Sequence, residues 1–304
     1  MSKSQPLIFD IKRYSINDGP GIRLTIFFKG CPLRCRWCHN PESLLPQVQK
    51  LYTASKCIGC GECVKVCPNH ASSLSEGGVQ TDVDLCQICG SCAKACPTLA
   101  TEMSGRAYSV EELMGIIEKE IPFFDQSGGG VTFSGGEPLL HTSLLCDLLK
   151  LCGERQIHRA VDTSGYALWP DLFKVSEQTE LFLFDLKLMD ATRHKQFTGV
   201  DNRLILENLQ ALAATGAQIE IRVPLILGIN DDRQNLEQMA RFVAELPGTR
   251  PGISLLPFHA VAENKYKKLG QAYEISEMAE PTLEQLQQAT ELFARQGLVA
   301  SVGG

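Results

Sequence analysis

Residues 24–38 decide how this chain can fold, and their sequence is LTIFFKGCPLRCRWC. The run begins with apolar, β-branched and aromatic side chains, which predict a buried β-strand over 24–28. The strand passes directly into three cysteines, Cys31, Cys35 and Cys38. A site closed by four protein ligands is structural or carries electrons, whereas a missing ligand leaves a position for substrate. The stretch therefore predicts a strand that ends at an open metal centre.

Two kinds of centre fit these three cysteines. A [4Fe–4S] cluster held by three thiolates exposes one iron to an external chelating ligand. The alternatives are a zinc site completed by His39, or three thiols that share no metal. We expect the cluster, with Cys31, Cys35 and Cys38 as its ligands.

The composition of the whole chain also points to metal. It has 304 residues and 13 cysteines, 11 of which lie between Cys31 and Cys96. The first residues, 1–6, lack the apolar stretch of a signal peptide, so we expect a cytoplasmic protein in which disulfides are rare. Its net charge is −6, and no apolar run is long enough for a membrane span. We therefore expect neither a nucleic-acid partner nor a membrane.

The segment 50–104 is dense in cysteine, glycine and proline and contains an internal repeat. Its two copies have the spacing C-x2-C-x2-C-x3-C-P, and they begin at Cys57 and Cys86, which gives a period of 29 residues. This is the bacterial ferredoxin pattern for two [4Fe–4S] clusters, in which the fourth cysteine of each run ligates the other cluster. The predicted ligand sets are Cys57, Cys60, Cys63 and Cys96 for one cluster, and Cys86, Cys89, Cys92 and Cys67 for the other. The alternatives are zinc, which usually takes paired C-x2-C modules, or a relic without metal.

From residue 105 onward, short apolar runs alternate with longer amphipathic stretches. The expected strands are 131–134, 159–162, 181–185, 219–223, 253–256 and 298–302, and the expected helices are 109–120, 141–155, 203–215, 232–246 and 282–296. This alternation favours parallel βα units. We predict an α/β fold, a full or partial TIM-like βα barrel, divided into a first strand and cluster loop (1–49), an insert (50–104) and the rest of the barrel (105–304). In such barrels the reactive groups sit at the carboxyl ends of strands.

Polar residues follow several of these strands. Ser134-Gly135-Gly136-Glu137-Pro138 offers exposed carbonyls and a carboxylate that suit an ammonium group, although an ordinary Gly-Pro turn is the alternative. Asp162, Thr163, Ser164, Asp185 and Lys187 end the next two strands, and Arg222 and His259 close later ones. A surface salt bridge for Lys187 and a solvated ring for His259 remain the alternatives.

The cysteine loop resembles that of the radical S-adenosylmethionine (SAM) superfamily, with Trp37 in its aromatic slot. A longer match, from Asp18-Gly19-Pro20-Gly21-Ile22-Arg23 to Cys38-His39-Asn40, is similar to the activating enzymes of glycyl radical enzymes, relatives of pyruvate formate-lyase activase. The insert is similar to that of the long, ferredoxin-bearing members. This resemblance implies three [4Fe–4S] clusters, bound SAM and a radical SAM barrel.

The resemblance also implies a function and site residues. The enzyme would cleave SAM reductively to methionine and a 5′-deoxyadenosyl radical, which takes a hydrogen atom from a backbone glycine of a partner enzyme. The implied SAM contacts are Trp37, Gly135, Gly136, Glu137, Asp162, Thr163, Ser164, Asp185, Lys187, Arg222 and His259. Asp162, Thr163 and Asp185 could also hold a monovalent cation. The cofactors carry the chemistry, so no catalytic acid or base is expected.

We also expect two protein partners, and some residues and the function itself have alternative interpretations. The partner is a glycyl radical enzyme, the electron donor is a flavodoxin or ferredoxin, and the 18–23 loop is expected to meet the partner. The run Lys265-Tyr266-Lys267-Lys268 is either a docking surface or a solvated loop, and Cys146 and Cys152 are interpreted as packing residues. The alternative functions are a radical SAM peptide-modifying dehydrogenase, in which auxiliary cysteines follow the barrel, and an iron–sulfur electron carrier.

Overall fold

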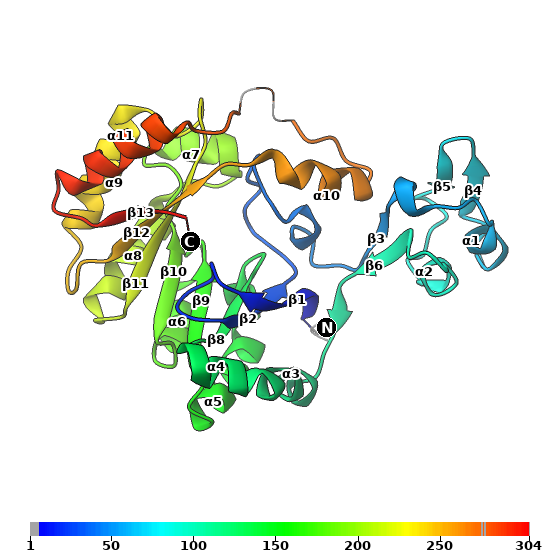
Figure 1. The fold of residues 1–304 in the computed structure, drawn as a ribbon, viewed down its shortest axis with the longest axis horizontal. Helices are drawn as coiled ribbons and strands as arrows, with labels where there is room; N and C mark the ends of the chain where they lie inside the picture. Colours follow the sequence, from blue (N-terminus) through cyan, green and yellow to red (C-terminus); the bar gives the residue numbers. More distant parts are fainter. Residues whose placement is uncertain (1–5, 275, 277, 304) are drawn as a thin grey trace.

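The computed structural model describes residues 6–274, 276 and 278–303. Most of the segment 1–6, from which we expect no signal peptide, lies outside the described residues, because these begin at residue 6. Figure 1 shows a curved sheet with helices along its outer side, and a smaller lobe at one end of the molecule. A two-stranded ribbon, β3 and β6, leads from the sheet to that lobe.

The main sheet positions the functional site. Within the described residues it has nine strands in the order β13-β12-β11-β10-β9-β8-β2-β1-β7. Their bounds are β1 Leu7–Ser15, β2 Arg23–Phe28, β7 Arg106–Ala107, β8 Gly130–Gly135, β9 His158–Thr163, β10 Leu181–Asp185, β11 Ile219–Leu225, β12 Gly252–Pro257 and β13 Ala300–Val302. β2 and β8 to β13 are parallel, while β1 is antiparallel to β2 and β7. The predicted parallel α/β sheet is confirmed, and it is a partial barrel with β7 and β13 at its edges.

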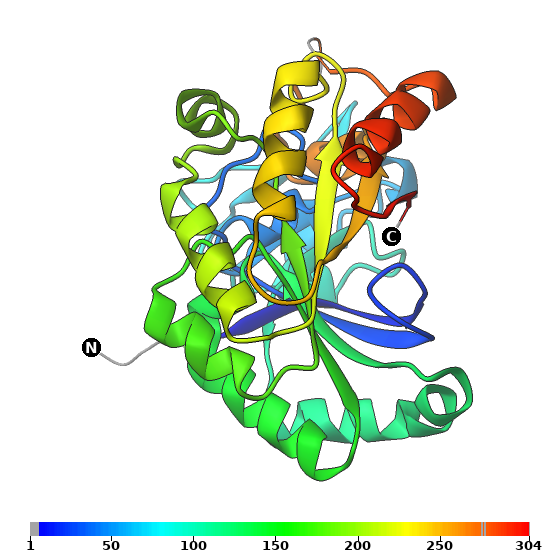
Figure 2. The ribbon, with the colours of Figure 1, turned by 90° about the vertical axis from the view of Figure 1, so that its left-hand side faces the viewer.

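Most of the helices connect these strands and cover the outer face of the sheet, as Figures 1 and 2 show, whereas α10 lies beside the β3–β6 ribbon. Their bounds are α3 Val110–Ile117, α4 Ile121–Ser127, α5 Thr142–Glu154, α6 Trp169–Ser176, α7 Ala191–Thr198, α8 Arg203–Ala214, α9 Arg233–Ala244, α10 Glu263–Lys268 and α11 Leu283–Ala294. The predicted start of α11 is confirmed, because Thr282 and Gln285 form a capping box there. None of the helices that the structure describes has both the length and the apolarity needed to cross a lipid bilayer.

Alternate residues along each strand point to the apolar core on one face of the sheet and to the functional site on the other. On β2, Leu24, Ile26 and Phe28 join the apolar core beneath the helices. The residues between them face the inside of the curved sheet, where Thr25 binds Asp18 and Phe27 lines a cavity. Because successive strand residues point to opposite faces, the same sequence builds the core and the site at once. The other parallel strands follow this rule, so their inner residues converge.

The lobe repeats its backbone as well as its sequence. It comprises β3 Gln49–Tyr52, α1 Glu62–Lys65, β4 Ser72–Ser75, β5 Gly78–Thr81, α2 Ser91–Lys94 and β6 Thr101–Ser104. Left-handed residues recur at the 29-residue period, with φ of 74° at Gly61 and 78° at Gly90, and 52° at His70 and 54° at Leu99. His70 and Leu99 adopt a left-handed conformation that is rare and unfavourable for residues other than glycine. The two copies therefore have the same loop geometry.

Candidate functional site

A cavity of about 280 Å³ lies at the carboxyl ends of the parallel strands. It brings together most of the side chains that the sequence predicted: Cys31, Cys35, Trp37, Cys38, Gly135, Gly136, Asp162, Thr163, Ser164, Asp185, Lys187 and Arg222. Other lining residues were not predicted as SAM contacts, among them Asp18, Phe27, Asn40, Ser134 and Phe258. The strand-end rule could have found Ser134 and Phe258, because each immediately precedes a residue that we did single out.

The three cysteines sit on a loop that is held from two sides. The backbone nitrogens of Arg34 and Arg36 donate to the carbonyls of Thr198 and Phe197 at the end of α7, at 2.6 and 3.0 Å. On the other side, the nitrogen of Gly30 donates to the carbonyl of Ser43 at 2.7 Å. Burial raises the pKa of each cysteine thiol, Cys31, Cys35 and Cys38, to about 12. A metal that binds them must therefore displace their protons.

The donor set fits an iron–sulfur cluster that leaves room for a polar ligand. Three soft thiols face one cavity together with carboxylates, a lysine and an arginine. Within the residues that the structure describes, no three His, Cys, Asp or Glu side chains are grouped so as to hold a single metal ion. A cluster instead takes one thiolate at each of several separate iron atoms.

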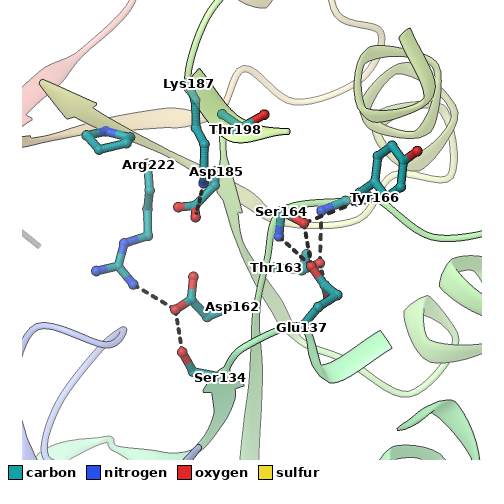
Figure 3. Close-up of polar contacts among 12 residues, drawn as sticks. Ser134, Glu137, Asp162, Thr163, Ser164, Tyr166, Asp185, Lys187, Thr198 and Arg222 are labelled. Carbon is teal, nitrogen blue, oxygen red and sulfur yellow. Dashed lines mark hydrogen bonds and ion pairs between the residues drawn. The ribbon is translucent and has the colours of Figure 1, made fainter. Parts of the chain in front are cut away.

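A chain of polar contacts crosses the inner face of the sheet, as Figure 3 shows. Ser134 Oγ donates to Asp162 Oδ2 at 2.6 Å, and Arg222 Nη1 lies 3.3 Å from the same oxygen. Burial raises the pKa of Asp162 to about 6, although the charge of Arg222 opposes this. Among the described residues, the buried Nε of Arg222 has no hydrogen-bond partner. Within the described part of the chain, the Arg222 guanidinium therefore has one N–H that no protein group accepts. The sequence predicts that Arg222 closes its strand, but β11 continues to Leu225.

Lys187 is a buried residue of the cavity rather than a surface one. Its side chain is 8% exposed, and its Nζ donates to Asp185 Oδ2 at 2.5 Å. Burial alone would lower the pKa of Lys187, but the charges of Asp185 and then Cys35 raise it above its ordinary value. Lys187 does pair with Asp185, but it is buried in the cavity, so the alternative of a surface salt bridge is wrong about its location. Lys187 keeps its charge beside the cysteine loop.

The Gly135-Gly136-Glu137 turn packs tightly against the cysteine loop. A Cβ on Gly136 would lie 2.1 Å from the carbonyl oxygen of Gly30, so only glycine fits. Both glycines line the cavity, but Glu137 does not. Its fully buried carboxylate accepts hydrogen bonds from Leu139, Thr163 and Ser164 instead. Burial raises the pKa of Glu137, and those hydrogen bonds oppose the rise. Figure 3 shows these hydrogen bonds of Glu137 beside the contacts of Asp162 with Ser134 and Arg222.

Trp37 and His259 differ in their placement. Trp37 is buried in an apolar cluster with Leu188, Phe197 and Phe258, and it borders the cavity. The His259 side chain is 54% exposed, and its Nδ1 lies 3.2 Å from Glu280. The neighbouring Phe258, not His259, lines the cavity. A contact between His259 and SAM therefore stays a prediction.

The 18–23 loop divides into an inner and an outer part. Arg23 is fully buried, and it donates to Thr132 Oγ1 and the Val131 carbonyl, both at 2.6 Å. The Arg23 side chain therefore anchors the loop, and contact between the 18–23 loop and the partner stays a prediction. Asp18 reaches the cavity, where Thr25 Oγ1 donates to it at 2.7 Å and Arg222 lies 3.8 Å away.

The remaining cysteines occupy two settings. The eight insert cysteines lie in the lobe, where Cys60 and Cys89 are exposed and Cys63 is buried. Cys67 lines a second cavity with Cys86, Cys89 and Cys92 of the other copy. Cys152 is buried in the core and Cys146 packs against it, as the packing interpretation predicted.

Comparison with known proteins agrees with this geometry. The family model of the radical SAM superfamily matches residues 25–243. The chain is 43% identical to the trans-4-hydroxy-L-proline dehydratase activating enzyme of Clostridioides difficile, across 98% of this chain and 99% of that one. It is 41% identical to the choline trimethylamine-lyase activating enzyme of Oleidesulfovibrio alaskensis, across 90% of each. A crystallised domain of a pyruvate-formate lyase-activating enzyme from Bacteroides vulgatus is 42% identical, with a TM-score of 0.51, and spans 58% of this chain and 99% of the domain.

The fold and the cysteine cavity thus define a radical SAM protein, and the chain belongs to that superfamily. Within it, the chain belongs to the activating enzymes of glycyl radical enzymes. Its activity is SAM-dependent activation of a partner glycyl radical enzyme, with a [4Fe–4S] cluster and SAM as cofactors. These relatives favour activation over the peptide-modifying dehydrogenase and the electron carrier.

Proposed function

We propose that this chain is a long-form activating enzyme with three [4Fe–4S] clusters. In this proposal residues 50–104 are a ferredoxin-like module that is inserted between 1–49 and 105–304, and it carries two of the clusters. The repeated backbone supports two equivalent cluster loops. The cavity that Cys67 shares with Cys86, Cys89 and Cys92 supports the crossed ligand sets.

The third cluster is assigned to Cys31, Cys35 and Cys38, and SAM to the same cavity. This assignment rests on one observation, namely that the three thiols, the Arg222 side chain and the Gly135–Gly136 turn line one cavity. When bound, the cluster and SAM supply one-electron cleavage of the sulfonium bond, which yields methionine and the 5′-deoxyadenosyl radical that takes a hydrogen atom from the partner's glycine.

The chain's own residues bind and orient these cofactors. In this proposal Arg222 offers a guanidinium N–H to the carboxylate of SAM. The carbonyls of the Gly135–Gly136 turn accept hydrogen bonds from the ammonium group of SAM. Asp162 and Asp185 are paired with Arg222 and Lys187, so a monovalent cation at these carboxylates competes with those side chains. Trp37 and Phe258 supply apolar walls that exclude water.

Iron analysis of anaerobically reconstituted protein tests this assignment. Wild type should bind roughly 12 iron atoms, four per cluster. Cys67→Ala should lose about four of them and still cleave SAM with a small-molecule reductant, whereas Cys35→Ala should lose SAM cleavage. Cys146→Ala is the matched control and should keep all of its iron. Full iron in Cys67→Ala, or SAM cleavage in Cys35→Ala, contradicts the assignment.

We infer further that a flavodoxin or ferredoxin delivers the electron, in the cytoplasm. Eleven of the thirteen cysteines are proposed cluster ligands, which must be reduced thiolates and not disulfides, and this supports a reducing compartment. The test compares a reduced flavodoxin with a small-molecule reductant, and it follows the glycyl radical signal of candidate partner enzymes. A partner that gains the signal with active enzyme, SAM and reduced flavodoxin, and faster than with the small-molecule reductant, supports the inference. Equal or slower activation with the flavodoxin contradicts it.

A further inference from the structure

Both strands of the β3–β6 ribbon, which joins the lobe to the main sheet in Figure 1, meet the side chain of Lys29 where they leave the sheet. Lys29 follows β2 and precedes Cys31 by two residues. Its side chain is completely buried, which is unusual for a lysine. The residue therefore stands where the sheet, the cysteine loop and the insert meet.

On the entry side, Lys29 holds the connection between the cysteine loop and the lobe. Its Nζ donates to the backbone carbonyl of Glu42 and, at 2.9 Å, to Gln49 Oε1. Glu42 belongs to the short helix η1, Pro41–Ser43, and Gln49 is the first residue of β3. One nitrogen atom therefore binds both ends of the segment 42–49.

On the exit side, the chain passes directly over the stem of the same lysine. Gly105 follows β6 with a φ of 101°, and a Cβ there would lie 2.6 Å from Lys29 Cδ. A larger residue would displace the lysine stem. Ser104 pairs with Gln49 across the ribbon. The strands that enter and leave the lobe thus rest on one side chain, and we call this junction the Lys29 joint.

The charge of Lys29 matters at this joint as well as its size. Burying an ammonium group away from water is costly unless it finds hydrogen-bond acceptors. An apolar side chain of the same length would fill the space without that cost. What lysine adds is two directed, charge-assisted hydrogen bonds, one toward the cysteine loop and one toward the lobe. These bonds fix how the lobe is oriented on the sheet.

The Lys29 joint lies between the site cysteines and one cysteine set of the lobe. Lys50, the residue after Gln49 on β3, borders the second cavity, which is lined by the cysteines Cys67, Cys86, Cys89 and Cys92. Helix α2, which contains Cys92, packs against β6, and Figure 1 shows α1 farther out in the lobe. The cluster assigned to this cavity is therefore the inner cluster of the lobe.

We propose that Lys29 is a positioning residue that fixes the lobe on the barrel and sets the separation between the inner cluster and the cluster at Cys31, Cys35 and Cys38. The proposal rests on the proposed function, which assigns a [4Fe–4S] cluster to each of these cysteine sets. Electron transfer between clusters slows steeply as their separation grows. The joint thus keeps one path open, in which the reduced inner cluster is oxidised as it passes an electron to the site cluster, and the flavodoxin or ferredoxin reduces it again.

The test is pulsed EPR on the reconstituted full-length protein, reduced with dithionite and read on the cluster signal that responds to SAM. A reduced inner cluster at a fixed distance speeds the spin relaxation of that signal, so wild type should show a single fast relaxation time. Lys29→Met should replace it with a spread of slower times. Gln49→Leu, which removes only the acceptor on the lobe side, should do the same, and it carries the test if Lys29→Met does not fold.

Three further variants calibrate the relaxation measurement. Lys12→Met and Gln80→Leu make the same substitutions at exposed positions on β1 and β5, and they should relax as wild type does. Cys67→Ala lacks the inner cluster and should relax slowly. If Cys67→Ala has lost iron but relaxes as wild type does, the clusters are not held close and the Lys29 proposal fails. If Cys67→Ala keeps all of its iron, the proposed function fails instead.

Hydrogen exchange of the same anaerobic holoenzymes measures the joint through the backbone. Lys29→Met and Gln49→Leu should speed the exchange of the amides in 42–49 and 101–107, and leave those of β9 and β10 unchanged. Unchanged exchange in both variants overturns the joint. Faster exchange combined with the wild-type relaxation time overturns its effect on the clusters.

Discussion

The carboxylate of Glu137 accepts two hydrogen bonds from Ser164, one of 2.9 Å from the backbone nitrogen and one of 2.5 Å from Oγ. Thr163 Oγ1 adds a third at 2.7 Å. These bonds tie the turn after β8 to the end of β9, where Asp162 also stands. The carboxylate that the sequence placed against the SAM ammonium group is therefore saturated by the protein. Its effect on the site is to hold two strand ends in register.

Glu137→Gln should test this positioning role. The amide turns an acceptor into a donor that faces the donors of Ser164 and Thr163, so apo protein should lose about 2–4 kcal/mol of unfolding free energy. Urea unfolding measures this loss. Glu154→Gln, on the exposed end of α5, is the control and should change little. Wild-type stability combined with loss of SAM binding would show that Glu137 contacts SAM directly.

The pH dependence of apo stability should report Asp162. Burial raises the pKa of this carboxyl from 3.8 to about 6, against Arg222 and alongside Asp185 and Asp18. A raised pKa favours the protonated folded state, so this contribution is present below pH 4 and is lost as pH rises through about 6. Between pH 4 and 7, Asp162→Asn should gain roughly 3 kcal/mol relative to wild type.

The measurement is a series of urea unfolding curves for the metal-free proteins across that pH range. The exposed Asp125→Asn variant on α4 controls for a change in net charge, and its profile should run parallel to that of wild type. If the Asp162→Asn profile is also parallel, burial does not raise the pKa of Asp162 in the folded protein.

Most strands and the main helices could be predicted because their signal is local. β10 and β12 are short apolar runs, and α9 and α11 carry an apolar stripe with a cap at the first turn. β1 was not predicted because its outer residues, such as Asp10 and Lys12, are exposed and charged, next to the edge strand β7. Pairing with β2 makes it a strand, and pairing is not visible in a local pattern.

Much of the site could also be predicted, because strand ends meet at one edge of a parallel sheet. The roles of individual side chains could not. Glu137 and Arg23 belong to motifs that suggest ligand or partner contacts, yet both are buried and bound to the chain itself. Such facts depend on where a side chain points after folding.

Arg23→Met should separate anchoring from partner contact. The substitution leaves Thr132 Oγ1 and the Val131 carbonyl without a buried donor, so the unfolding free energy should fall by about 2–4 kcal/mol. SAM cleavage and partner activation should fall together, because the loop that presents Asp18 loosens. Arg106→Met, which breaks an exposed pair with Glu112, is the control. Loss of partner activation, with SAM cleavage and stability intact, would show that Arg23 acts through contact between the 18–23 loop and the partner.

Lys265 and Lys267 offer a paired test of the basic run on α10. Lys265 binds Asn40 and Glu42 beside the cysteine loop, whereas Lys267 pairs with Glu263 on the same exposed helix surface. Exposed pairs of the second kind contribute about 0.3–0.5 kcal/mol. Lys265→Met should therefore lower the thermal stability of the holoenzyme and speed the loss of iron in air, and Lys267→Met should do neither. If both variants keep stability and iron but bind the partner less tightly, the run is a docking surface and does not fasten α10.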